Sequence, residues 1–587
     1  HQVGNVMRII GNVHADWTIL PNLDLKARLG SDVRDFRYHQ YFPIGSLAAG
    51  GSNGRASESS DRTINILNEE TLTYQKSINN DNHVKVLVGY SYQQEKSSSL
   101  GAASYDFPSN YYLWNNLGLG ATPQTPGSGS SKWTLLSFFG RLNYSYRDKY
   151  LLTASLRRDG SSKFGTNNKY GLFPSIALAW RLGQEKFIKN LGVFSHLKAR
   201  ASYGVTGNSG IGVYHSLSRI STSNQYEFGG SQVPDAYPSN VANPNLSWEK
   251  TKEIDFGLNA GFFHDRLSIT TDYYYKKTTA LLLNVPLPSQ TGYGSVLENI
   301  GSMRNKGFEF AFNSQNLTGP LHWTTNFNIS FNRNMILSLG GAPYLYTGWV
   351  GDGNVVPHGR HVVRLQPGHP IGEFYGSIYD GVWHSQSEIN QVGTMPAAKP
   401  GDIRFKDTNG DGVYNTNDDQ FLGNPNPKFS FGFTNNFNYK QWSLNVFIYG
   451  EYGNKILNLT KERLIEQGTG LGIQRLNRWT PQNPNSNIPG AASINPIRAS
   501  SNMIEDGSFL KVGNLGLTYN IPVHQWHLSA LHRASIAFNV SDLLTITKYS
   551  GYDPEVNSYG SSNTTKGLDR YGYPAARTYR LDIKFGF

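Results

Sequence analysis

Residues 7–33 read MRIIGNVHADWTILPNLDLKARLGSDV, and apolar side chains recur at alternate positions on both sides of Pro21-Asn22. These apolar positions are Met7, Ile9, Val13, Ala15, Trp17, Ile19, Leu23, Leu25, Ala27, Leu29 and Val33. The polar positions between them are Arg8, Asn12, His14, Asp16, Thr18, Asp24, Lys26, Arg28 and Asp32. This alternation predicts two β-strands joined by a short turn. A dry core could not bury the polar faces, whereas a membrane β-barrel directs one strand face to lipid and the other to its lumen.

The composition of the 587 residues agrees with a barrel. Aromatic residues make up 13% of the chain and there are 62 Gly, yet only 38% of residues are hydrophobic. No apolar run approaches the ~18 residues that a membrane helix needs. Polar lumen faces and aromatic girdles at both membrane interfaces account for such a composition.

Charge and cysteine content exclude other classes of protein. The chain has no Cys, which excludes disulfides and thiolate metal sites. The formal net charge is +11, but no block of Lys and Arg is typical of nucleic-acid binding. We therefore expect no nucleic-acid partner and assign the excess positive charge to the lumen and the rims of a barrel.

Alternation recurs along the whole chain and predicts about seventeen strands. The expected ranges are 5–20, 23–34, 63–78, 83–94, 133–147, 149–158, 171–182, 197–207, 247–263, 266–283, 304–316, 320–334, 428–440, 441–452, 509–521, 533–549 and 577–587. Short turns alternate with long Gly/Ser/Asn/Pro-rich loops near 35–62, 95–132, 208–246, 335–427 and 453–508. Bacterial barrels have short periplasmic turns and long extracellular loops, so the fold class expected is an all-β transmembrane antiparallel β-barrel.

The strand count carries a further expectation. Single-chain bacterial barrels have an even number of strands. The strands expected here are odd in number: the first starts on the extracellular side and the last ends in the periplasm. We expect residues 1–587 to be an incomplete C-terminal part of a barrel of about 22 strands. The alternative is a miscount by one strand. An open wall would leave unpaired strand edges in lipid, so the sequence predicts that the isolated chain misfolds or aggregates.

The last strand has a pattern of its own. Tyr579, Leu581, Ile583, Phe585 and Phe587 alternate with Arg580, Asp582 and Lys584 up to the final residue. A terminal strand that ends on an aromatic residue resembles the insertion signal of outer-membrane barrels.

Four stretches of the chain resemble the SusC/RagA family of TonB-linked outer-membrane proteins from Bacteroidetes-type bacteria. They are residues 243–251 (NPNLSWEKT) with 272–278 (DYYYKKT), 300–309 (IGSMRNKGFE), 401–412 (GDIRFKDTNGDG) with 421–429 (FLGNPNPKF), and 553–557 (DPEVN) with 573–577 (YPAAR). The resemblance covers nearly the whole chain, and the stretch 401–412 is the most specific of the four.

The resemblance implies active uptake of oligosaccharides or peptides across the outer membrane. Family members work with a SusD-like surface lipoprotein that covers the barrel, and the TonB complex pulls on a plug domain inside it. Neither the N-terminal plug domain nor a TonB-contacting segment is recognisable in this sequence. We therefore expect contact with TonB to run through a plug that is missing from this sequence.

One loop has the spacing of a calcium site. Oxygen-bearing residues at positions 1, 3, 5, 9 and 12, a Gly at position 6 and a backbone carbonyl at position 7 can surround a hard cation. The residues of this predicted site are Asp407, Asn409, Asp411, Val413, Asn415 and Asp418. Asp418 replaces the usual Glu, and no helices are expected on either side of the loop. The alternative is a turn-rich loop whose Asp and Asn side chains bind their own backbone.

Loop aromatics are the candidates for substrate contact, because sugar rings stack on aromatic faces. We single out Tyr112, Trp114, Tyr346, Trp349 and Trp383. The alternative for each of them is packing between loops or a place in the interfacial girdle.

Enzymatic activity is not expected. The sequence shows no nucleophile elbow, no metalloprotease helix and no phosphate-binding loop. The leading hypothesis is the barrel of a nutrient importer in the outer membrane. A structural or adhesive barrel without pumping is the second hypothesis, and a secreted all-β glycan-binding or hydrolytic protein is the third.

Overall fold

The computed structural model describes residues 1–222, 225–349, 361–461, 477–490, 499–526, 531–560 and 562–587. The chain forms two compact units. Unit 1 contains His1–Trp180, Ala201–Glu253 and Thr278–Ile300. Unit 2 contains Arg181–Arg200, Ile254–Lys277 and Gly301–Phe587.

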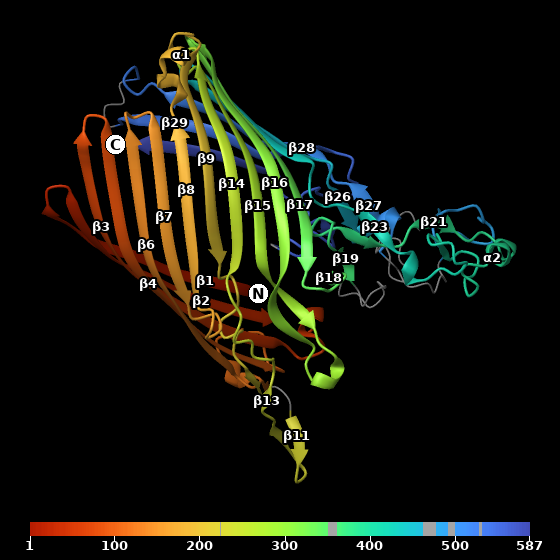
Figure 1. The fold of residues 1–587 in the computed structure, drawn as a ribbon. Coiled ribbons are helices and arrows are strands. Elements are labelled where there is room, and N and C mark those ends of the chain that lie inside the picture. The colour runs from red at the N-terminus through yellow and green to blue at the C-terminus, as the bar shows by residue number, and fades with distance from the viewer. Residues whose placement is uncertain (223–224, 350–360, 462–476, 491–498, 527–530, 561) are drawn as a thin grey trace. The chain divides into compact units, whose positions relative to one another are not determined.

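Unit 1 contains seven long strands, which pair antiparallel in chain order (Figure 1). They are β1 (Gln2–Leu20), β2 (Leu23–Phe42), β3 (Arg55–Asn79), β4 (Asn82–Tyr105), β6 (Gly127–Tyr146), β7 (Tyr150–Ser161) and β8 (Tyr170–Trp180). The β1–β2 ladder runs from Gln2 opposite Gln40 to Leu20 opposite Leu23, with the turn at Pro21-Asn22. Asn22 has a positive φ of 71°, a conformation that Asn tolerates in tight turns.

Unit 2 contains a second run of antiparallel strands in chain order. They are β17 (Leu321–Leu339), β24 (Phe429–Tyr439), β25 (Trp442–Tyr452), β28 (Phe509–Ile521), β29 (Arg533–Thr547) and β31 (Thr578–Gly586). Four more strands have residues in both units: β9 (Phe194–Asn208), β14 (Glu249–Phe262), β15 (Leu267–Pro286) and β16 (Ser295–Thr318).

All seventeen expected strands are present, and with the two-residue β5 (Thr122–Pro123) the described residues form one sheet of eighteen strands. The fold class expected from alternation is confirmed. β1 pairs antiparallel with β2, and β31 pairs antiparallel with β29. The number of strands in a complete wall stays a prediction.

The strands reach further into two of the expected loops than the sequence pattern indicated. The connection near 35–62 shortens to residues 43–54, and the one near 95–132 shortens to 106–126. Ser97, Ser98 and Ser99 show no alternation, yet they pair with β3 on one side and β6 on the other. Ladder hydrogen bonds on both edges hold these small polar residues in a strand despite their weak intrinsic preference.

Short elements lie in the long connections. In unit 1 they are β10 (Ile220–Ser221), β11 (Gln225–Phe228), β12 (Ser231–Pro234) and β13 (Tyr237–Pro238). In unit 2 they are α1 (Lys186–Lys189), β18 (Leu345–Trp349), β19 (His361–Leu365), β20 (Phe374–Gly376), β21 (Tyr379–Val382), α2 (Gln386–Val392), β22 (Ile403–Phe405), β23 (Gln420–Gly423), β26 (Lys455–Asn458), β27 (Ile504–Asp506) and β30 (Leu568–Asp569). In Figure 1, β18 to β23 and α2 lie together beyond one end of β17.

Buried apolar residues form small clusters, two of which join wall strands to the long connections that follow them. Unit 1 has one cluster of Phe164, Phe173, Ile211, Leu246 and Trp248. A second cluster contains Tyr41, Ala56 and Phe107. In unit 2, Trp383 packs with Ile389 and Ala398. The loops are therefore folded structures with small cores of their own.

The last hairpin shows how the two faces of the wall differ. Ile536 lies opposite Ile583 and Phe538 opposite Leu581, so one face is apolar. On the other face Asn539 donates to Asp582 at 2.9 Å. The apolar face is suited to lipid and the polar face to a wet lumen.

Because Leu581 belongs to the apolar face, we predict that Leu581→Arg in the full-length protein destabilises the folded wall by about 2–4 kcal/mol. The urea midpoint of folding into lipid vesicles measures this change. Lys584→Arg, on the opposite face of the same strand, is the control and should leave the midpoint unchanged. Equal midpoints for the two variants would show that the face assignment is wrong.

Candidate functional site

A three-stranded sheet in unit 2 joins three segments that are far apart in the sequence. β26 pairs antiparallel with β27 and parallel with β30. Ile456, Leu457 and Leu568 are fully buried there, which makes the sheet the apolar base of this region. The strands of this sheet position the polar side chains that follow.

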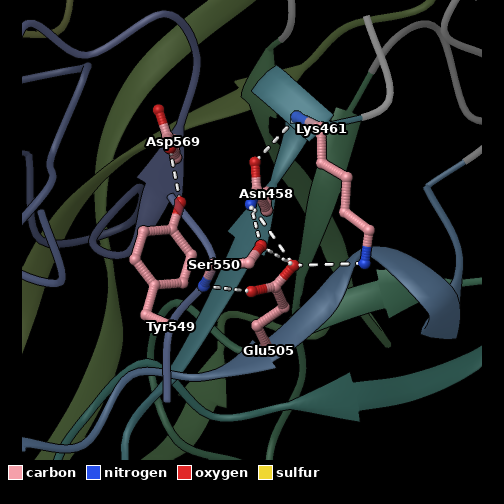
Figure 2. A network of polar contacts seen from close by, with 6 residues as sticks. All are labelled: Asn458, Lys461, Glu505, Tyr549, Ser550 and Asp569. Atoms are coloured by element: carbon pink, nitrogen blue, oxygen red, sulfur yellow. Dashed lines mark hydrogen bonds and ion pairs between the residues drawn. The ribbon is translucent and has the colours of Figure 1, made fainter. Parts of the chain in front are cut away.

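Glu505 is the centre of a hydrogen-bonded network on this sheet (Figure 2). Its Oε2 accepts the Ser550 backbone N–H at 2.8 Å, and its Oε1 accepts the Ser550 hydroxyl at 2.8 Å. The Lys461 ammonium donates to the same Oε1 at 3.2 Å. Asn458 donates to Glu505 at 3.3 Å and accepts the Lys461 backbone N–H at 2.8 Å. The network fixes residue 550, just beyond β29, against β26 and β27.

Two opposing effects set the pKa of Glu505. Desolvation on burial disfavours the carboxylate, but the two hydrogen bonds from Ser550 and the charge of Lys461 outweigh it. The pKa of Glu505 is therefore lowered below its usual value of 4.5, and the group is ionised at neutral pH.

Tyr549 and Asp569 form a second buried contact in Figure 2. The Tyr549 hydroxyl donates to Asp569 Oδ2. Asp569 Oδ1 accepts the Thr460 hydroxyl at 2.9 Å and the Gly572 N–H at 3.2 Å. Burial raises the pKa of Tyr549, and the hydrogen bond and charge of Asp569 raise it further, so the phenol stays a donor.

Lys511 on β28 binds the segment around residues 553–555, which lies beyond β29, to the wall. Its side chain is 2% exposed, and its ammonium donates to Asp553 Oδ1 at 2.9 Å and to Glu555 Oε2. Tyr449 on β25 donates to the same Glu555 oxygen at 2.8 Å. A buried cation needs such partners, because an unpaired charge away from water is very unfavourable.

Beside these contacts lies an open pocket of about 630 Å³, lined by residues of the stretches 552–558 and 569–575. The stretches 553–557 and 573–577 carry part of the family resemblance in the sequence, and the structure brings them to the same pocket. The roles of Lys511, Tyr549 and Asp569 were not predicted. Tyr549 and Asp569 lie four residues before the stretches 553–557 and 573–577, whereas Lys511 is distant from both in the sequence.

The aromatic candidates of unit 1 have different surroundings. Tyr112 is 49% exposed and makes an edge contact with Tyr111 at 5.1 Å between ring centroids. Trp114 packs against the cluster of Tyr41, Ala56 and Phe107 and stacks on His39. Tyr112 therefore keeps an accessible ring, whereas Trp114 is part of the loop core. Substrate contact by either residue stays a prediction.

The aromatic candidates of unit 2 also differ. Tyr346 on β18 packs against Tyr344 and Tyr375, and burial raises its pKa to about 12. The Trp349 side chain lies outside the described residues. Trp383 is fully buried among Ile389 and Ala398, and substrate contact by this residue stays a prediction. A loop aromatic can serve as the core of its own loop, which composition alone does not reveal.

In the predicted calcium loop, side-chain oxygens accept backbone N–H groups of the loop itself. Asp407 accepts from Gly410 at 2.6 Å and from Gly412 at 2.8 Å. Both glycines have a positive φ, which this tight path requires.

The other predicted ligands of this loop behave in the same way. Asn409, Asp411 and Asn415 each accept the N–H two residues on. The Val413 carbonyl accepts from Asn415 at 3.2 Å. Asp418 is fully buried and accepts the N–H groups of Thr408, Asn409 and Asn415.

Across the part of the chain that the structure describes, no group of three or more His, Cys, Asp or Glu side chains is arranged to hold a metal ion. The contacts within residues 407–418 match the alternative to a calcium site, which is a turn-rich loop whose Asp and Asn side chains accept hydrogen bonds from the loop's own backbone. Calcium binding by this loop stays a prediction of the sequence.

Among the described helices, none has the length and apolar character needed to cross a membrane. The large antiparallel sheet, with one apolar and one polar strand face, has the architecture of an outer-membrane β-barrel wall. The family described as TonB dependent receptor-like, beta-barrel matches residues 9–543, and the chain belongs to it.

Curated relatives agree with this assignment. The chain is 36% identical over 585 residues to TonB-dependent receptor P3 of Formosa agariphila, covering 98% of this chain and 58% of that protein. It is 31% identical over 471 residues to TonB-dependent receptor SusC of Bacteroides thetaiotaomicron, covering 77% of this chain and 44% of SusC. The chain thus spans little more than half the length of the relative P3.

A solved structure agrees as well. A chain of the RagAB peptide transporter superposes with a TM-score of 0.84 at 26% identity, covering 100% of this chain and 62% of that one. The resemblance to the SusC/RagA family is confirmed, and with it the location in the outer membrane. The family is one of transporters and receptors.

We predict that Tyr549→Phe in the full-length protein speeds tryptic cleavage after Lys548. The variant leaves buried Asp569 without one of its donors, which lowers the free energy of local opening by about 1–3 kcal/mol. The cleavage rate, followed by mass spectrometry, measures this effect. Tyr552→Phe is the control, because Tyr552 is 78% exposed. An unchanged rate for Tyr549→Phe would contradict the role assigned to the buried contact.

The lowered pKa of Glu505 predicts a pH dependence. A carboxyl group with a lowered pKa stabilises the fold above its unfolded-state pKa of about 4.5, and this contribution is lost as pH falls through the folded-state pKa. Hydrogen exchange in the segment 500–510, corrected for intrinsic rates, should therefore rise below about pH 4.5. Glu505→Gln should show faster exchange at pH 7 and a flatter pH profile. Identical profiles for the two proteins would contradict this assignment.

Proposed function

We propose that the protein to which this chain contributes its wall is an active nutrient importer that takes up oligosaccharides or peptides. The observation that carries the proposal is the match of 98% of the chain to TonB-dependent receptor P3. The superposition on a chain of the RagAB peptide transporter supports it. The chain's membership of a TonB-dependent outer-membrane transporter family follows from the family match itself and does not depend on this proposal.

Energy coupling is the first part of the proposal. The outer membrane has no ion gradient of its own, so uptake against a concentration gradient needs work from the inner membrane. We infer that the TonB complex supplies it through a plug domain within the lumen. The polar strand faces of the wall would surround that plug.

The partner is the second part of the proposal. SusC and a chain of the RagAB peptide transporter are both similar to this chain, and the SusC/RagA resemblance implies a SusD-like surface lipoprotein as partner. We infer that such a lipoprotein covers the extracellular loops. The folded loop regions, with their small cores, offer it a preformed surface.

Uptake by cells tests the first part. Cells that express the full-length protein should accumulate a labelled oligosaccharide or peptide, and removal of TonB or addition of a protonophore should abolish accumulation. Accumulation that persists without TonB and without a proton gradient would favour the second candidate, a passive or adhesive barrel.

Purification tests the second part. The full-length protein, extracted in mild detergent with an affinity tag, should bring down one surface lipoprotein in about a one-to-one ratio. A tagged outer-membrane barrel of another family, purified in parallel, is the control. Recovery of the barrel without any lipoprotein would contradict the proposed partner.

A further inference from the structure

Lys511, Asp553 and Glu555 bring one amine and two carboxyl groups together in the interior of unit 2. The Lys511 side chain on β28 is 2% exposed, and its ammonium donates to Asp553 Oδ1 at 2.9 Å and to Glu555 Oε2. Asp553 is 42 positions away in the sequence, in the connection after β29. A buried amine held against a carboxyl group is the geometry from which an amide bond can form, because burial replaces the chance encounter of the two groups.

The surroundings of Lys511 favour the neutral groups that such a reaction needs. An ammonium and a carboxylate do not react until a proton has passed from one to the other. Phe509 lies beside Lys511, with its ring centroid 5.7 Å from Nζ. Burial disfavours charged forms, and a proton that leaves Nζ has two carboxylates to accept it.

Glu555 is placed to carry that proton. Its Oε2 accepts from Lys511 Nζ and also accepts the Tyr449 hydroxyl at 2.8 Å. The hydrogen bond from Tyr449 fixes the carboxyl group against the amine. A carboxylate in direct contact with the amine can act as a general base toward the nitrogen and then as a general acid toward the departing oxygen.

The two oxygens of Asp553 differ in their surroundings. Within the described residues, both hydrogen bonds to the Asp553 side chain go to Oδ1, from Lys511 and from the Glu555 backbone N–H at 3.0 Å. This N–H stabilises the negative charge that develops on Oδ1 when the nitrogen attacks the carboxyl carbon. Asp553 also lines the open pocket at residues 552–575, so Oδ2 has a route by which to leave as water.

We propose that Lys511 and Asp553 form an intramolecular amide bond in the folded protein, with Glu555 carrying the proton. Proton transfer makes the amine and the acid neutral, Nζ attacks Asp553 Cγ, the N–C bond forms and the bond from Cγ to Oδ2 breaks. The ammonium loses two protons in all, and they leave with Oδ2 as one molecule of water. Glu555 ends unchanged, and no co-reactant is needed.

The bond gives the fold a covalent connection that it has no other means of making. The chain has no Cys, so no disulfide can join the wall to its connections. A cross-link between residues 511 and 553 ties β28 to the stretch 553–557 and stabilises the fold by restricting the unfolded chain. The inference concerns the maturation of the protein and does not rest on the proposed import function.

Mass spectrometry of the full-length protein tests the proposal. The protein is purified from outer membranes, denatured and digested with trypsin, which does not cleave after an acylated lysine. The bond joins residues 499–533 to residues 549–566 in one product, which is lighter by one water than the two peptides together. Without the bond, trypsin cleaves after Lys511 and releases the peptide of residues 549–566 by itself.

Lys461 is the control within the same digest. Its ammonium binds Glu505 at 3.2 Å, and its side chain is 37% exposed. Water around this pair keeps both groups ionised, so no amide should form there. Trypsin should therefore release residues 456–461 in full.

Variants test the roles of the three residues. Glu555→Gln keeps the size of the side chain but cannot carry the proton, and it should lower the fraction of cross-linked product about tenfold or more. Lys511→Arg should abolish the product, because a guanidinium stays charged. Glu451→Gln is the matched control, since Glu451 on β25 faces Lys566 instead, and it should leave the fraction unchanged.

We expect the cross-linked product in most molecules of the unaltered protein. Complete release of the separate peptides from unaltered, folded protein would overturn the proposal whether or not the variants fold. Cleavage of the chain between Asp553 and Pro554 in place of the cross-link would overturn it as well. An equal cross-linked fraction in Glu555→Gln would overturn the role given to Glu555.

Discussion

The requirement that every backbone N–H and C=O in lipid has a hydrogen-bond partner determines the rest of this structure. Strands of up to 25 residues meet it by ladder pairing, as β3 does with β2 and β4. Since each strand has two faces, the same ladders fix which side chains meet lipid and which meet the lumen. The pairs Ile536–Ile583 and Phe538–Leu581 show the result on one hairpin.

In the long connections outside the wall, the need to pair buried charged and polar side chains takes the place of the backbone requirement. The described parts of the long connections keep their shape through a few buried polar contacts and small apolar clusters. Lys511, Glu505 and Asp569 each bind partners from distant parts of the chain. Because a half-satisfied buried charge is costly, such contacts hold a loop in one arrangement. That arrangement creates the open pocket at residues 552–575.

The loop aromatics illustrate why composition is a weak guide to a binding site. Trp383 and Tyr573 are both loop aromatics, yet Trp383 is fully buried and Tyr573 is 94% exposed. Trp383 packs against Ile389 of the short helix α2 and against Ala398 in the turn after it, whereas Tyr573 belongs to no buried cluster among the described residues. Likewise, the Asp and Asn residues of 407–418 have the spacing of a cation site, and their contacts in the fold are with their own backbone.

The sequence by itself determined the wall. Period-two alternation is a local property, so it located the strands, the short turns and the apolar face of the last strand, and the motif stretches indicated the family. It did not find strand segments such as Ser97–Ser99, because only pairing with neighbours on both sides makes them strands. The tertiary structure alone decided which loop side chains are buried and which line a pocket. These depend on contacts between residues more than a hundred positions apart, such as Thr460 with Asp569, which no local pattern encodes.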